Sequence, residues 1–265
     1  MTRCGPLSTH ARAALSVLAW VLAVAWAGAP GGAGVLGAQE ITVPGVEASH
    51  RAGLFARVEG EVQAALLTDS DDVRRRHLAA AEQLARYLTD SDSTDADAFY
   101  WLAVAQGIRT EHSGPFQKLT SGKEVFFTTA HILELDSLHA GGHEMMGRLH
   151  AAVMRLPWLV RGLALRMGMG EVLGDASWER AEWHYARAVE LDPAAVAPRL
   201  ELAKLYVERE RAAEAVPVLQ ALAGMAPEDR LDEGMLQEAR RLLGGIEERG
   251  RGGGAAQAVG GQWSL

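Results

Sequence analysis

The chain has 265 residues, of which 48% are apolar and only 6% aromatic, and its formal net charge is −8. This composition is typical of packed helices and argues against a β-sandwich, and the negative charge disfavours a nucleic-acid partner. The one cysteine, Cys4, lies in a segment that we expect to be removed, so the mature chain is expected to hold no disulfide and no cysteine-bound metal.

Residues 1–38 have the pattern of a secretory signal peptide. Arg3 and Arg12 supply positive charge around the start of an apolar run at 13–27, which is short for a membrane span. Small residues favour cleavage before Gln39, and a cut directly after the apolar run is the alternative. We therefore expect an exported protein, periplasmic or secreted. The other interpretation is an uncleaved segment that anchors the chain in the inner membrane.

The remaining chain divides into three parts by composition. Residues 39–47 contain Pro44 and Gly45 and predict an extended lead-in. Residues 48–248 carry apolar side chains at spacings of three and four, which predicts a domain of amphipathic helices. The Gly-rich residues 249–265 show no periodicity and predict a disordered tail.

Capping-box patterns predict where several helices of this domain begin. The pattern occurs as Thr68 with Asp71, Thr94 with Asp97, and Ser121 with Glu124. We expect the first two to start helices that end near Leu88 and Glu111. Gly114 and Pro115 are then expected to end the helix that precedes them, and the next helix is expected over 125–135.

A spacing of 34 residues defines the C-terminal half. Ala181, Tyr185, Ala188 and Pro193 recur as Ala215, Leu219, Leu222 and Pro227. The spacing resembles that of the tetratricopeptide repeat, a helix pair that buries its apolar face on its neighbours. The small residues Ala181, Ala188 and Ala203 are expected where two helices touch. The predicted fold is all-α, a tetratricopeptide-repeat-like right-handed superhelix. It carries a helical insertion at 156–176 and a C-terminal capping helix at 231–248.

Residues 96–244 resemble the helical domain of the regulator of microtubule dynamics family, in its secreted bacterial branch. The segments that carry the resemblance are residues 99–105 (FYWLAVA), 139–143 (HAGGH), 147–150 (GRLH), 156–158 (LPW) and 176–182 (ASWERAE). The resemblance implies an all-α scaffold with no catalytic residues and no cofactor. Eukaryotic members are associated with microtubules and organelle membranes. An exported bacterial chain meets no microtubule, so that role is not transferred.

In tetratricopeptide proteins the first helix of each pair lines the concave face. Carried over to this chain, the groove positions are Tyr100, Val104, Ile108, Glu144, Arg148, Leu200, Lys204 and Val207. Arg148 and Lys204 are expected to hold an anionic group, and the apolar positions an extended chain. The function predicted is a non-catalytic scaffold or binding module for a protein or peptide partner. A carrier of a lipid or other amphiphile is the alternative.

The insertion begins with Trp158 and places Leu156, Leu159, Leu163 and Met167 on one helical face. Such a basic, tryptophan-led helix has features of a membrane-surface helix. Few arginines are present and the protein is acidic overall, so we favour docking of this face onto the helical stack, over the concave surface. Trp158 is included among the candidate binding residues.

Three histidines, His139, His143 and His150, fall on one stripe of a predicted helix, with His131 and Glu144 nearby. Two of them have the i,i+4 spacing of a helical zinc site, which makes a histidine-ligated metalloenzyme the weaker alternative. The stripe also coincides with packing positions of the repeat, and Ala140 stands where a zinc protease motif needs glutamate. Packing is therefore favoured, and no metal or catalytic residue is expected.

The signal-peptide interpretation is tested by N-terminal sequencing of the protein recovered outside the cytoplasm. The first residue should be Gln39 or close to it, because cleavage follows small residues at the end of the apolar segment. Recovery of the intact Met1 terminus in the membrane fraction would contradict export with cleavage.

Overall fold

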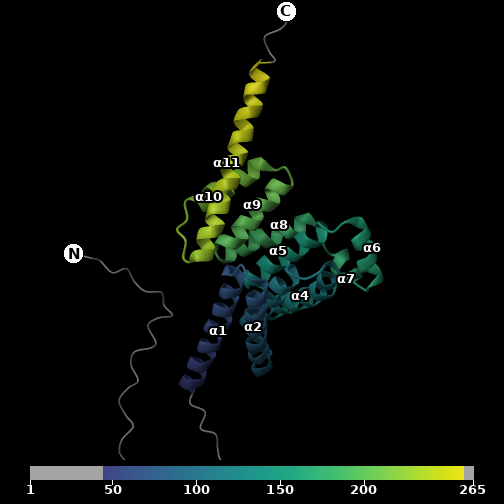
Figure 1. Cartoon of the computed structure of the whole chain (residues 1–265), viewed down its shortest axis with the longest axis vertical. Coiled ribbons are helices and arrows are strands. Elements are labelled where there is room, and N and C mark those ends of the chain that lie inside the picture. Colours follow the sequence, from purple (N-terminus) through teal and green to yellow (C-terminus); the bar gives the residue numbers. More distant parts are fainter. Residues whose placement is uncertain (1–43, 260–265) are drawn as a thin grey trace, which may run out of the picture. The chain divides into compact units, whose positions relative to one another are not determined.

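The computed structural model describes residues 44–259 of the chain. This part contains eleven helices and no strand, which confirms the predicted all-α class (Figure 1). The helices are α1 (Pro44–Leu67), α2 (Asp71–Ser91), α3 (Ala96–Glu111), α4 (Pro115–Leu135), α5 (Ala140–Met154), α6 (Trp158–Arg166), α7 (Gly170–Gly174), α8 (Trp178–Leu191), α9 (Val196–Glu208), α10 (Ala212–Ala223) and α11 (Arg230–Val259).

Helices that follow one another in the chain pack side by side, with one exception. From α1 to α5 and from α8 to α11 each helix contacts the next, whereas α5 contacts α8 directly. The short helices α6 and α7 lie to the side of this array (Figure 1). The insertion predicted at 156–176 therefore interrupts the sequence without interrupting the stack. The tetratricopeptide assignment itself stays a prediction.

The array holds its apolar residues in four buried clusters rather than in one. The first lies among α1, α2 and α3, and the second among α9, α10 and α11. The third joins α4 and α5 to the insertion, and the fourth lies between α5, α8 and α9. This succession is what a stack of helix pairs produces, because each pair buries its apolar face only on its neighbours.

The contact between α5 and α8 depends on small residues. Ala151 on α5 and Ala181 and Ala188 on α8 have no exposed surface, and Gly147 lies beneath the ring of Tyr185. A Cβ at position 147 would stand 2.8 Å from two ring carbons. The predicted positions of Ala181 and Ala188 at a helix contact are confirmed. Ala203, predicted to lie at another contact, is fully buried in the second cluster.

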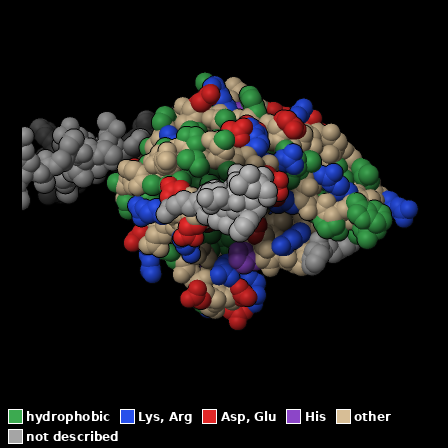
Figure 2. Space-filling view, turned by 90° about the horizontal axis from the view of Figure 1, so that it is seen from above, with side chains coloured by type: hydrophobic (Ala, Val, Ile, Leu, Met, Phe, Trp, Pro, Cys, Tyr) green, Lys and Arg blue, Asp and Glu red, His purple; other side chains and the backbone are tan. Residues whose placement is uncertain are grey.

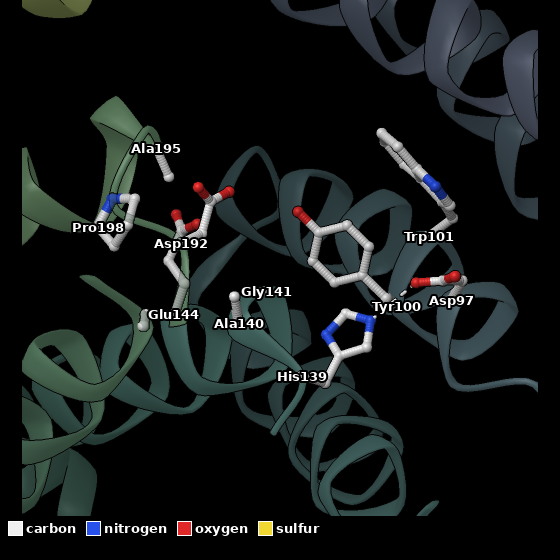
Figure 3. A pocket seen from close by; sticks show the side chains of 11 residues that line it. Asp97, Tyr100, Trp101, His139, Ala140, Gly141, Glu144, Asp192, Ala195 and Pro198 are labelled. Atoms are coloured by element: carbon white, nitrogen blue, oxygen red, sulfur yellow. Dashed lines mark hydrogen bonds and ion pairs between the residues drawn. The ribbon is translucent and has the colours of Figure 1, made fainter. Parts of the chain in front are cut away.

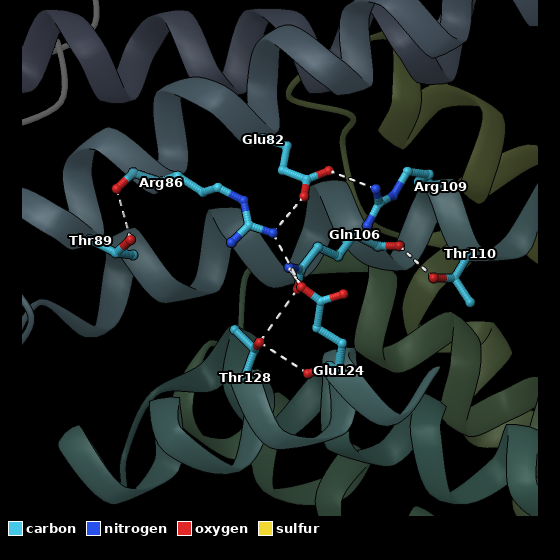
Figure 4. Close-up of polar contacts among 8 residues, drawn as sticks. All are labelled: Glu82, Arg86, Thr89, Gln106, Arg109, Thr110, Glu124 and Thr128. Carbon is cyan, nitrogen blue, oxygen red and sulfur yellow. Dashed lines mark hydrogen bonds and ion pairs between the residues drawn. The ribbon is translucent and has the colours of Figure 1, made fainter. Parts of the chain in front are cut away.

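A polar network ties α2, α3 and α4 together on one side of the first cluster (Figure 4). Arg86 contacts Glu82 at 2.8 Å and Glu124 at 3.2 Å, and Arg109 contacts Glu82 at 3.3 Å. The buried amide of Gln106 donates to Glu124 at 2.8 Å. A buried amide needs such a partner, so this network fixes α4 against α3.

The helix caps differ from the predicted capping boxes by one or two residues. Ser70, not Thr68, caps α2 by accepting from the Val73 N–H. Asp95, not Thr94, caps α3. Ser, Thr and Asp compete as caps because each offers a side-chain oxygen, and the pattern alone did not decide which oxygen reaches the free N–H groups.

The start of α4 was also predicted wrongly. The helix begins at Pro115, so Ser121 and Glu124 lie inside it and form no capping box. Proline is favoured in the first turn of a helix, where its missing N–H needs no partner. The pair Gly114-Pro115 therefore marks both the end of one helix and the beginning of the next.

The two ends of the helical domain extend further than predicted. The lead-in assigned to 39–47 is helical from Pro44, again with proline in the first turn. The tail assigned to 249–265 is helical as far as Val259, because extending an existing helix costs less than starting one. The signal peptide, the first part of the lead-in and the last residues of the tail lie outside the described residues. Among residues 44–259, none of the helices combines the length and the apolar composition that crossing a membrane requires.

Replacing Gly147 by alanine should destabilise the protein by about 1–3 kcal/mol, because the added methyl overlaps the buried Tyr185 ring. The matched control is Gly162→Ala in α6, where the new Cβ meets nothing within 4 Å. That change should be neutral or stabilising by up to about 1 kcal/mol, since alanine favours the helix. Urea unfolding of both variants measures the difference. Equal midpoints would contradict the close α5–α8 contact.

Candidate functional site

The predicted groove residues separate into a polar set that shares one face and an apolar set that is largely packed. Tyr100, Glu144, Arg148 and Lys204 lie on this face, which we call the inner face together with Glu201 of α9 and Glu238 of α11.

The apolar groove positions have other roles. Leu200 is only 2% exposed and belongs to the second core cluster, so its placement in the groove was wrong. Val104 and Ile108 pack against the first cluster and Val207 against the second. These side chains are apolar because they complete the cores, not because the insertion covers them.

A chain of ion pairs runs along the inner face from α5 to α11. Arg148 contacts Glu144 at 2.9 Å and Glu201 at 3.8 Å. Lys204 contacts Glu201 at 3.1 Å and Glu238 at 3.4 Å. Burial by itself would lower the pKa of Arg148, but the attraction of Glu144 and Glu201 outweighs it and raises the pKa. Arg148 therefore stays charged.

These pairs change what the inner face offers a ligand. Arg148 and Lys204 both contact Glu201. Each is already paired with carboxylates, and Glu144, Glu201 and Glu238 outnumber the two cations. An anionic head group would have to compete with these carboxylates, so the geometry does not favour the anion site that the sequence suggested.

A pocket of about 340 Å³ opens at one end of this face (Figure 3). Its lining comes from α3, α5, the end of α8 and the start of α9. The lining residues are Asp97, Tyr100, Trp101, His139, Ala140, Gly141, Glu144, Ala188, Asp192, Ala195 and Pro198. The lining contains three carboxylates and two large aromatic rings but neither lysine nor arginine. Of these residues, the sequence had predicted only Tyr100 and Glu144 as site residues.

His139 fixes one wall of the pocket. It caps α5, because its Nδ1 accepts the Gly142 N–H at 2.9 Å. The proton is therefore on Nε2, which donates to Asp97 Oδ1 at 3.1 Å. This hydrogen bond lowers the pKa of Asp97 below its usual value. His139, which the weaker alternative would make a zinc ligand, is thus a helix cap and a carboxylate partner.

Tyr100 lines the pocket beside His139, and its position depends on Gly141. A Cβ at residue 141 would overlap Cε2 of the Tyr100 ring, so only glycine allows this contact. The ring centroid lies 5.2 Å from that of His139 and 5.4 Å from that of Trp101. Burial raises the pKa of Tyr100, which keeps its hydroxyl protonated.

The other two histidines of the predicted stripe are packed in the interior. His143 is 4% exposed and His150 2%, which agrees with the packing interpretation. His143 Nε2 donates to the Ser137 carbonyl at 3.1 Å, and its Nδ1 lies 3.0 Å from Nδ1 of His184. The sequence analysis missed His184, whose ring also stacks on His150. His131 lies apart, paired with Glu134.

These histidines do not assemble into a metal site in the part of the chain that the structure describes. No group of three or more histidine, cysteine or acidic side chains there is arranged to hold an ion. Burial lowers the pKa of His143 and of His150, and it lowers that of His184 to about 3. All three are therefore neutral packing residues near pH 7.

The insertion packs on α4 and α5 rather than over the inner face. Val160, Ala164 and Met167 face that third core cluster. The predicted contact face was therefore wrong in two of its residues, since Leu159 and Leu163 are exposed. Trp158 is 78% exposed. Apolar side chains gather at the right edge of Figure 2, where α6 lies in Figure 1, beside basic ones.

The buried histidines predict a loss of stability in mild acid. Their pKa values are lowered in the folded state, so below about pH 6.5 the unfolded chain binds protons that the folded chain excludes. The free energy of unfolding should fall with pH by at most about 1.4 kcal/mol per unit for each histidine.

Urea unfolding between about pH 7.5 and pH 5 measures this slope. His184→Gln should make the dependence shallower, and the exposed control His50→Gln should leave it unchanged. A variant at position 184 with the wild-type slope would show that the imidazole is not excluded from protonation.

The amino-acid sequence is similar to that of known proteins over most of the helical domain. A family model described as "Regulator of microtubule dynamics protein 1-3" matches residues 47–247, which is more than half of the chain. Regulator of microtubule dynamics protein 3 of Rattus norvegicus is 25% identical over 182 residues. The match covers 67% of this chain but 38% of the rat protein, so the chain corresponds to a minor part of that relative's length.

Proposed function

The chain belongs to the regulator of microtubule dynamics protein 1-3 family, and from that premise we propose that it is a non-catalytic binding module for a protein or peptide partner. The partner would lie along the inner face, from the pocket at Tyr100 to Glu238. The observation that carries the proposal is the continuous row of ion-paired groups on three helices, α5, α9 and α11, which ends in an open pocket.

The geometry of this row suits an extended polypeptide. Arg148 and Lys204 are held in position by Glu144, Glu201 and Glu238, so their orientation is set before a partner arrives. Preorganised polar groups lose little entropy on binding. Their carboxylate partners accept hydrogen bonds from backbone N–H groups, and the two cations donate to carbonyls. A row of alternating donors and acceptors therefore matches a peptide backbone better than it matches an acyl chain.

The proposal places this protein outside the cytoplasm, as the pattern of residues 1–38 predicts. The rat protein's name refers to microtubules. An exported chain does not meet microtubules, so the proposed partner is another exported or envelope protein. The structural support for the proposal comes only from the inner face.

Site-specific photo-cross-linking in the cells that make the protein tests the proposal. The change Glu238→p-benzoylphenylalanine places the reactive group on the inner face, and Tyr87→p-benzoylphenylalanine places it on an exposed side of α2 as a nearly isosteric control. Irradiation should give a discrete cross-linked protein from position 238 and not from position 87. No adduct, or the same adducts from both positions, would contradict binding on the inner face.

A further inference from the structure

We propose that the pocket between α3, α5, α8 and α9 binds a guanidinium group, the side chain of an arginine presented by the polypeptide partner. The inference rests on the proposed function and adds the chemistry that the partner must carry. It starts from the charge of the pocket lining, which holds Asp97, Glu144 and Asp192 and no cationic residue.

Two of these carboxylates have acceptor capacity left for a ligand. Oδ1 of Asp192 accepts the Ala194 N–H at 3.0 Å, and Asp192 forms no ion pair in the described part of the chain. Glu144 receives both contacts from Arg148 on Oε1, which leaves Oε2 without that partner. Both carboxylates can therefore accept hydrogen bonds from a donor group that enters the pocket.

The aromatic wall adds a second feature that favours a cation. Tyr100 and Trp101 line the pocket, and planar cations stack favourably on such rings. Figure 3 shows the Tyr100 hydroxyl directed toward the side of the pocket where Glu144 and Asp192 lie. This hydroxyl makes no hydrogen bond to another described residue, and it is not one of the fully buried polar atoms that lack a partner. It can therefore exchange a hydrogen bond with a group that enters the pocket.

The arrangement fits a guanidinium better than a metal ion or an ammonium. The three carboxylates are not grouped closely enough to hold a metal ion. A guanidinium spreads five N–H donors over a plane, so it reaches acceptors that lie apart and stacks on a ring at the same time. A pocket of about 340 Å³ leaves room for the side chain that carries it.

The test uses two peptides that differ only in charge. Acetyl-Ala-Ala-Arg-Ala-Ala-amide is titrated into the full chain by calorimetry or NMR, and the same peptide with citrulline in place of arginine is the neutral control. We expect saturable one-to-one binding of the arginine peptide, about tenfold tighter than that of the citrulline peptide. Equal affinities, or no saturable binding of the arginine peptide up to about 10 mM, would overturn the proposal.

Substitutions then locate the site. Asp192→Asn keeps the acceptor for the Ala194 N–H and should weaken the arginine peptide about tenfold with an unchanged helical circular dichroism spectrum. Tyr100→Phe should weaken it by a smaller factor, about two- to fivefold. Asp72→Asn on the exposed start of α2 is the matched acidic control and should bind as the wild type does. Wild-type binding by the Asp192 variant would overturn the assignment.

The outcome is separable from that of the proposed function. If position 238 cross-links a partner and the arginine peptide does not bind, the guanidinium site is wrong and the binding module stands. If the arginine peptide binds through Asp192 and position 238 gives no adduct, the pocket is a receptor site and the extended inner face is wrong.

Discussion

The close approach of α5 and α8 is the contact on which the rest of the structure depends. The insertion separates these helices in sequence, so their packing is what joins the first half of the array to the second. Gly147, Ala151 and Ala181 allow it because they leave the helix backbones room to meet. As a result Arg148 on α5 reaches Glu201 on α9, and the pocket acquires walls from both halves.

Much of this fold could be predicted because each helix packs mainly on helices that are near it in the sequence. The 34-residue spacing identified Ala181 and Ala188 as contact residues, and both are fully buried. The insertion was recognised because it disturbed that spacing. Helix ends were harder to place, since several neighbouring residues can cap the same N–H groups. Asp95 replaces the predicted Thr94 for this reason.

The candidate site was less predictable because one residue of register decides which way a helical side chain points. Leu200 was assigned to the groove, but its neighbour Glu201 lies there, about 100° further round the helix. Asp192 and His184 gave no local signal, since their roles depend on contacts with residues more than 30 positions away. Sequence patterns identify the core-facing residues of a helix well. They identify poorly the residues that several helices bring together around a pocket.

One contact joins the two ends of this array and gives it a mechanical property. Gln63 on α1 donates to Asp229, just before α11, at 3.4 Å. A stack held only by contacts between neighbours bends easily, because small rotations at each joint add up along it. A hydrogen bond between the two ends limits the total rotation that these joints can accumulate. This hydrogen bond is exposed and contributes about 0.5–1.5 kcal/mol, so breaking it costs little free energy. The resistance of the helical array to bending therefore depends on whether the hydrogen bond between Gln63 and Asp229 is formed.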